Sequence, residues 1–131
     1  MHDVAIAFPP LIVMRGAVAA VWLYEGLWCK VFGRAWLEAE VVAKVPRFGP
    51  RFGQWFLKAL GAIEVMLAAW VISAIHPGAC AIAEMTLLVV LNFNGLLWAR
   101  DIIPDPAGMI VKNAAFLVLA WACGAIPGGW L

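Results

Sequence analysis

The chain has 131 residues, of which 66% are hydrophobic and 13% charged, and its formal net charge is +1. Its mean hydropathy of +0.95 is far from that of a soluble globular protein. These values predict one transmembrane domain over residues 1–131 without a soluble domain, and the absence of a basic patch argues against a nucleic-acid partner.

Four apolar runs follow one another, over about 10–32, 54–75, 79–99 and 107–125. At 1.5 Å per residue, about 20 residues match the roughly 30 Å hydrocarbon core of a bilayer. The segment His76-Pro77-Gly78 marks a tight turn between the second and third runs. The N-terminal residues lack the positive region of a secretory signal peptide, so we expect the first run to direct insertion. The predicted fold class is therefore all-α, a four-helix transmembrane bundle.

The segment between the first two runs, about 33–53, is the most polar part of the chain. From Ala35 to Val45, apolar residues alternate with charged ones at helical spacing. This pattern is typical of a short amphipathic helix that lies on the membrane surface. The alternative interpretation is an ordinary polar loop.

The basic residues are distributed very unevenly between the two sides of such a bundle. Of the nine, only Arg15 falls on the side of the termini. The other eight belong to the opposite side: Lys30, Arg34, Lys44, Arg47, Arg51, Lys58, Arg100 and Lys112. The positive-inside rule places this second side in the cytoplasm. We therefore predict a multi-pass protein of a bacterial-type inner membrane with both termini outside the cytoplasm.

Glu64 is central to the second apolar run. A carboxylate at the bilayer centre costs about 2.5–3.5 kcal/mol on insertion scales, so such a residue is usually buried in a bundle, paired or neutral. We predict that Glu64 faces the bundle interior. Gly61, one turn earlier on the same side, would let a neighbouring helix approach closely enough to cover the carboxyl group.

Other polar residues within the runs suggest two groups. Arg15 and Glu84 form a predicted outer ion pair. The predicted intramembrane polar cluster consists of Glu25, Lys30, Gly61, Glu64, Asn92, Lys112 and Asn113. Within it we predict that Lys112 pairs with an acid, Glu64 in first place and Glu25 in second.

The cluster has two open interpretations. Glu25 and Lys30 are five residues apart, about 140° around an α-helix, so they are not expected to share a face, and Lys30 is predicted to snorkel to the surface. Polar side chains of this kind often only hold membrane helices together. Alternatively, they form a pocket for a ligand, a quinone headgroup or a proton.

No catalytic or metal-binding motif stands out. The cysteines Cys29, Cys80 and Cys123 have no C-x-x-C spacing, and small apolar packing residues are a better interpretation of Cys80 and Cys123 than a disulfide. No histidine lies within a run, which argues against axial haem ligation. The residues alone identify neither a metal site nor an enzyme activity.

Three short segments resemble the DoxX-like family of small membrane proteins. The stretch 15–30, RGAVAAVWLYEGLWCK, resembles the family's first helix, with its early Arg followed by Trp, Gly and Lys. The stretch 60–65, LGAIEV, resembles the Gly-x-x-Glu element of the second helix. The stretch 106–113, PAGMIVKN, resembles the Lys-Asn start of the fourth.

The resemblance implies a four-helix inner-membrane protein embedded in the lipid bilayer beside other membrane subunits. Relatives include a subunit of thiosulfate:quinone oxidoreductase, bundles fused to epimerase-like domains, and members of redox and oxidative-stress assemblies. Two functions follow as hypotheses: an accessory or anchoring subunit of a larger complex, and a quinone-reactive redox component that uses the polar cluster. A small-solute transporter is disfavoured by the short chain and the lack of an internal repeat.

Overall fold

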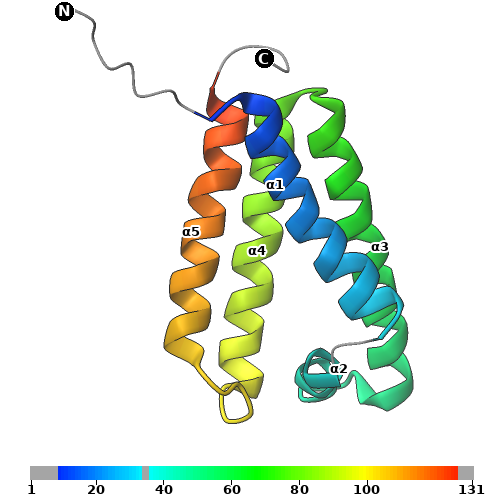
Figure 1. Ribbon diagram of the computed structural model, residues 1–131. Coiled ribbons are helices and arrows are strands. Elements are labelled where there is room, and N and C mark those ends of the chain that lie inside the picture. The colour runs from blue at the N-terminus through cyan, green and yellow to red at the C-terminus, as the bar shows by residue number, and fades with distance from the viewer. Residues whose placement is uncertain (1–8, 34–35, 127–131) are drawn as a thin grey trace, which may run out of the picture.

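The structure is a computed structural model that describes residues 9–33 and 36–126, and all regular structure in these ranges is helical. The elements are α1 (Leu11–Leu23), which continues directly into the π-helix η1 (Tyr24–Val31), α2 (Trp36–Ala43), α3 (Gly49–Ser73), α4 (Pro77–Ala99) and α5 (Pro106–Ala125) (Figure 1). The predicted all-α fold is confirmed.

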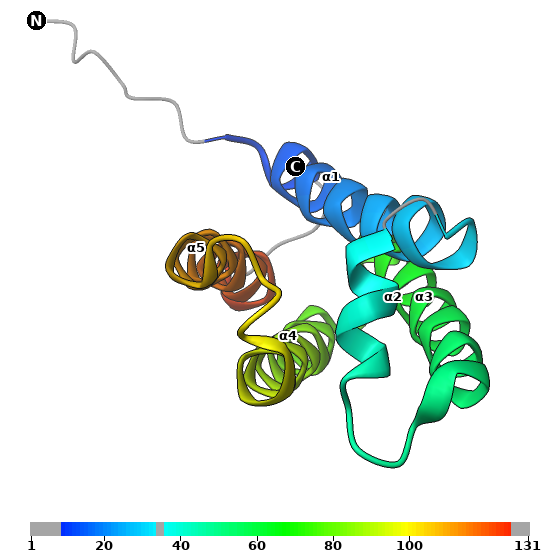
Figure 2. The ribbon, with the colours of Figure 1, turned by 90° about the horizontal axis from the view of Figure 1, so that it is seen from below.

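Four of the described helical stretches are long and apolar enough to cross a membrane: Leu11–Val31, Arg51–Ser73, Pro77–Ala99 and Pro106–Ala125. The short α2 lies across one end of this bundle, within the segment 35–45 for which the sequence predicts a surface helix (Figure 2). We call this end the α2 end. The opposite end, where α1 begins and α5 ends, is the terminal end.

Local sequence explains where the helices stop and start. The left-handed residues Ala74 (φ 58°) and His76 (φ 45°) form the turn after α3, and Pro77 is the first residue of α4. Proline suits that position because the first helical N–H has no partner within the helix. At α5, the Asp105 side chain accepts a hydrogen bond from the Gly108 N–H at 3.0 Å, which caps the helix.

The helices form two pairs. The α1–η1 stretch packs along α3, and α4 packs along α5. The pairs meet toward the terminal end, where the hydrophobic core cluster lies and where Trp22 meets Phe116 edge to face at 5.4 Å. Toward the α2 end the pairs diverge, and α2 lies between α3 and α4 there (Figures 1 and 2).

The two pairs are buried to different extents. In the most hydrophobic stretch of each span, 33% of residues are buried in α1–η1 and 39% in α3, against 17% in α4 and 11% in α5. Few residues of α4 and α5 are thus buried against the described part of the chain, and much of their surface is exposed. In a bilayer, this surface faces lipid or another protein.

Candidate functional site

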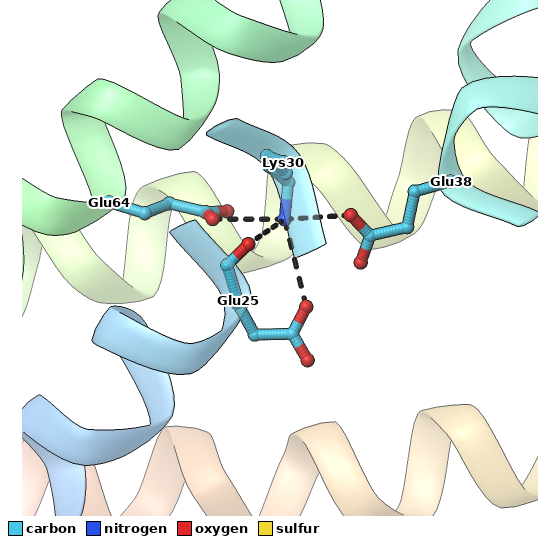
Figure 3. Close-up of polar contacts among 4 residues, drawn as sticks. All are labelled: Glu25, Lys30, Glu38 and Glu64. Carbon is cyan, nitrogen blue, oxygen red and sulfur yellow. Dashed lines mark hydrogen bonds and ion pairs between the residues drawn. The ribbon is translucent and has the colours of Figure 1, made fainter. Parts of the chain in front are cut away.

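Four charged side chains meet near the α2 end, and we call them the Lys30 cluster: Glu25, Lys30, Glu38 and Glu64. The Lys30 Nζ atom lies 2.9 Å from Glu64, 3.2 Å from Glu38 and 3.7 Å from Glu25. The side chains converge from η1, α2 and α3 (Figure 3). One ammonium group thus faces three carboxyl groups.

The π-helix η1 explains why Glu25 and Lys30 meet. In an α-helix, residues five apart point in clearly different directions, but the i→i+5 hydrogen bonds of a π-helix place them roughly above one another. Lys30 also donates to the backbone carbonyl of Glu25 at 3.5 Å. The prediction that Glu25 and Lys30 occupy different faces is therefore wrong. The prediction that Lys30 snorkels is wrong too, because its side chain is 8% exposed and bound within the cluster.

Two glycines bring η1 and α3 into direct backbone contact at the cluster. A Cβ atom on Gly61 would lie 2.7 Å from the Gly26 carbonyl oxygen and 2.8 Å from the Lys30 Cβ. A Cβ on Gly26 would lie 2.6 Å from the Gly61 carbonyl oxygen. This close approach covers Glu64, whose side chain is 2% exposed. The predictions that Glu64 faces the interior and that Gly61 allows close approach are confirmed.

Glu38 is the cluster residue that sequence analysis missed. It lies on α2, outside the four spans, and its alternating neighbours indicate a surface helix but not which side chain turns inward. Burial raises the pKa of Glu38 from its ordinary 4.5 to about 7, assisted by a hydrogen bond that protonated Glu38 donates to Glu25 and opposed by the positive charge of Lys30. Two carboxyl groups form such a hydrogen bond only when they share a proton.

Lys112 does not take part in the cluster. Its side chain is exposed on α5, while Glu64 pairs with Lys30. The predicted pair between Glu64 and Lys112 is wrong, since Glu64 is covered by η1, the chain's own preceding span, rather than by α5. Spacing along α5 gives no information about which neighbour that helix faces.

Comparison with known proteins identifies the family. The sequence model of the DoxX-like family matches residues 19–121, which is most of the chain. The chain belongs to the DoxX-like family. No curated protein and no solved structure gives a match. With four apolar helices, this DoxX-like protein is a multi-pass membrane protein, and the matched region contains all four members of the Lys30 cluster.

The two remaining members of the predicted polar cluster form a separate contact. The Asn113 side chain donates a hydrogen bond to Asn92 Oδ1 at 2.6 Å, and Asn92 donates to the Leu88 carbonyl at 2.7 Å. This contact joins α4 to α5. Within residues 9–33 and 36–126, no polar side-chain contact links it to the Lys30 cluster. Asn94 lies apart from this pair and donates to the Val90 carbonyl.

At the terminal end, this DoxX-like protein buries a second acid. Glu84 is 2% exposed and accepts a hydrogen bond from Trp22 Nε1 at 2.6 Å and another from the Cys80 thiol at 3.9 Å. Arg15 is 1% exposed and lines the same small cavity as Glu84. Their pairing stays a prediction. Trp22, whose indole binds Glu84, was not predicted.

The cysteines are small buried side chains. Cys29 is 4% exposed beside the Lys30 cluster, and Cys80 and Cys123 are 3% and 4% exposed beside the terminal cavity. All three are free thiols. Gly124 comes so close to α4 that an added Cβ would collide with Ala81. Cys80 and Cys123 thus lie where α4 and α5 are in tight contact.

Proposed function

We propose that this DoxX-like protein is an accessory or anchoring subunit of a larger, redox-linked membrane complex, and that it binds its partner through the outward faces of α4 and α5. The observation that carries this proposal is the low burial of these helices, 17% and 11% in their most hydrophobic stretches. The α1–η1 and α3 pair uses far more of its own surface for contact within the chain.

The chemistry of this outward face indicates the kind of partner. Val111 and Val118 on α5 are 67% and 58% exposed, and the exposed Lys112 lies between them in sequence. Lys112 is about two turns inside the helix, roughly 9 Å at 1.5 Å per residue. An intramembrane lysine is stabilised by a carboxylate nearby. The partner we propose is therefore a transmembrane helix with an acidic side chain at the depth of Lys112.

The orientation of the bundle is also part of the proposal. Seven of the described basic residues belong to the α2 end or the half of the bundle next to it: Lys30, Lys44, Arg47, Arg51, Lys58, Arg100 and Lys112. Arg15 belongs to the terminal half. By the positive-inside rule, the α2 end faces the cytoplasm of a bacterial-type inner membrane, and both termini lie outside.

A quinone-reactive role for the Lys30 cluster has weaker support. Lys30 is an intramembrane donor of the kind that binds a quinone carbonyl, but its ammonium group already faces Glu64, Glu38 and Glu25. A quinone would have to displace one of these carboxylates. We therefore keep this role as an alternative that the same experiment detects.

Site-specific photo-crosslinking in the native membrane tests the proposal. A photoreactive residue replaces Val111 on α5 in one variant and Met66 on α3, which is 70% exposed, in the control. We expect a discrete crosslinked partner from position 111 that position 66 does not give, and its loss in Lys112→Met. Crosslinks to lipid alone from both positions would contradict the proposal. A quinone retained after mild-detergent purification, and lost in Lys30→Met, would favour the alternative.

A further inference from the structure

The short helix α2 is attached to both halves of the bundle. On one side, Glu38 binds Lys30 of η1 at 3.2 Å. On the other side, Lys44, directly after α2, binds Asp101 in the turn between α4 and α5 at 3.3 Å. Figure 2 shows α2 lying across the end of the bundle between α3 and α4. Since the two helix pairs diverge at this end, α2 is the element that connects them there.

The first of these attachments carries an excess of negative charge. Three carboxyl groups face one ammonium group, so the fully ionised cluster would have a net charge of −2 at a site where the Lys30 side chain is 8% exposed. Carboxylate oxygens of Glu25 and Glu38 lie within 4.8 Å of one another. Carboxylates this close do not readily ionise together, which favours a proton on Glu38, whose pKa burial raises to about 7.

We propose that Glu25 and Glu38 form a proton-binding site that controls the attachment of α2: the protonated pair holds α2 on the bundle, and loss of the proton releases it. Glu38 is the member that moves, because it lies on the short helix, whereas Glu25 and Glu64 belong to membrane spans. The proton reaches the site through Glu38, which lies on α2, outside the four spans, and whose side chain is 29% exposed.

Titratable and charged groups lie near Glu38 on the elements packed against α2. On η1 they are Lys30, Glu25, Cys29 and Tyr24, and on α3 it is Glu64. On the α4 side, the charged contact of the α2 region is Asp101, which binds Lys44 rather than Glu38. Among the described residues, Lys30 is the positive group that forms an ion pair with Glu38, and Glu64 shares it at 2.9 Å.

The direction of the pH effect follows from the raised pKa of Glu38, about 7 when attached against an ordinary value of 4.5. An acid whose pKa is higher in the attached state makes its full contribution to attachment below pH 4.5. This contribution is lost as the pH rises through 7. The full shift corresponds to several hundredfold in the attachment equilibrium. Partial exposure of Glu38 reduces the expected change to about 30-fold between pH 5 and pH 8.

Spin-label distance measurements on the whole chain in lipid nanodiscs test this site. Labels at Ala39→Cys on α2, next to Glu38, and at Phe32→Cys, which ends η1 and is 58% exposed, report on the attachment of α2 to η1. The three native cysteines are buried and stay unlabelled. We expect a narrow distance distribution at pH 5 that broadens with a midpoint near pH 7. In Glu38→Gln, whose neutral amide resembles the protonated acid, the distribution stays narrow up to pH 8.

Glu40→Gln is the matched control, because Glu40 is an exposed acid two residues along the same helix. It should broaden with the same midpoint as the unmodified chain. Glu25→Gln provides a second variant should Glu38→Gln fail to fold, and it should move the midpoint to lower pH. A distribution that is constant from pH 5 to pH 8, or a midpoint that both Glu38→Gln and Glu25→Gln leave unchanged, would overturn the proposal.

Discussion

The terminal end and the α2 end of the bundle both bury a glutamate, but they stabilise it differently. At the terminal end, Glu84 accepts hydrogen bonds from the indole of Trp22 and the thiol of Cys80, beside the main hydrophobic cluster. At the α2 end, Glu64 binds the ammonium group of Lys30 at a crossing of two glycines. Both of these donors to Glu84 are uncharged, and the buried Arg15 lines the same cavity. An ion pair with two further carboxylates makes the α2 end sensitive to charge.

The largest effect should come from removing Lys30. Lys30→Met keeps the length of the side chain but leaves Glu64 buried without its partner, and breaking one side of a buried ion pair costs about 3–5 kcal/mol. We expect that loss in the free energy of unfolding, measured by reversible denaturation in detergent micelles. Lys112→Met is the matched control, because Lys112 is exposed and should cost under about 0.5 kcal/mol. Equal effects of the two variants would mean that the α2 end does not depend on its ion pairs.

A substitution at Gly61 should have the next largest effect. In Gly61→Ala, the added methyl group meets the Gly26 carbonyl oxygen and the Lys30 Cβ at less than 3 Å, so η1 and α3 must move apart. Overpacking of this kind costs about 1–3 kcal/mol. Thermal denaturation followed by helical circular dichroism measures it. Gly16→Ala on α1 is the control, since nothing lies within 4 Å of a Cβ there. A Gly61→Ala protein as stable as Gly16→Ala would show that the close crossing is not needed.

Sequence reasoning predicted those features of the α2 end that depend on burial alone. The cost of a carboxylate in a bilayer places Glu64 inside, and a small residue one turn earlier indicates a close helix contact. The prediction of the partner of Glu64 was wrong, because the partner is Lys30, which η1 brings to it. A π-helix has no clear sequence signature, yet its i→i+5 geometry changes the direction of every side chain after Tyr24. Glu38 could not be assigned either, because its position depends on how α2 folds back on the bundle.

The terminal end should respond more weakly, by an amount typical of one hydrogen bond. Trp22→Phe keeps an aromatic ring beside Phe116 but removes the Nε1 donor to Glu84. Hydrogen bonds between membrane helices contribute about 0.6–2 kcal/mol. A double-mutant cycle of Trp22→Phe with Glu84→Leu, which removes the acceptor, should therefore give a coupling free energy of this size. Trp121→Phe, at an exposed position, should show no coupling to Glu84→Leu. If this coupling free energy were larger than the one between Lys30 and Glu64, the terminal end would depend more strongly on its polar contacts than the α2 end, contrary to the comparison above.

The smallest effect concerns the contact between Asn92 on α4 and Asn113 on α5, which lies outside both acid sites. Asn113 donates to Asn92 between α4 and α5, and both groups are neutral amides. If the charged character of the α2 end is confined to η1, α2 and α3, this contact should behave as an ordinary interhelical hydrogen bond. The coupling between Asn92→Leu and Asn113→Leu should then be about 0.6 kcal/mol and independent of pH from 5 to 8. Asn94→Leu is the control, because Asn94 donates to its own helix at the Val90 carbonyl and should not couple to Asn113→Leu. A coupling that changes with pH would connect the Asn92–Asn113 contact to the proton site at Glu25 and Glu38, and would extend the charge-sensitive region across the bundle.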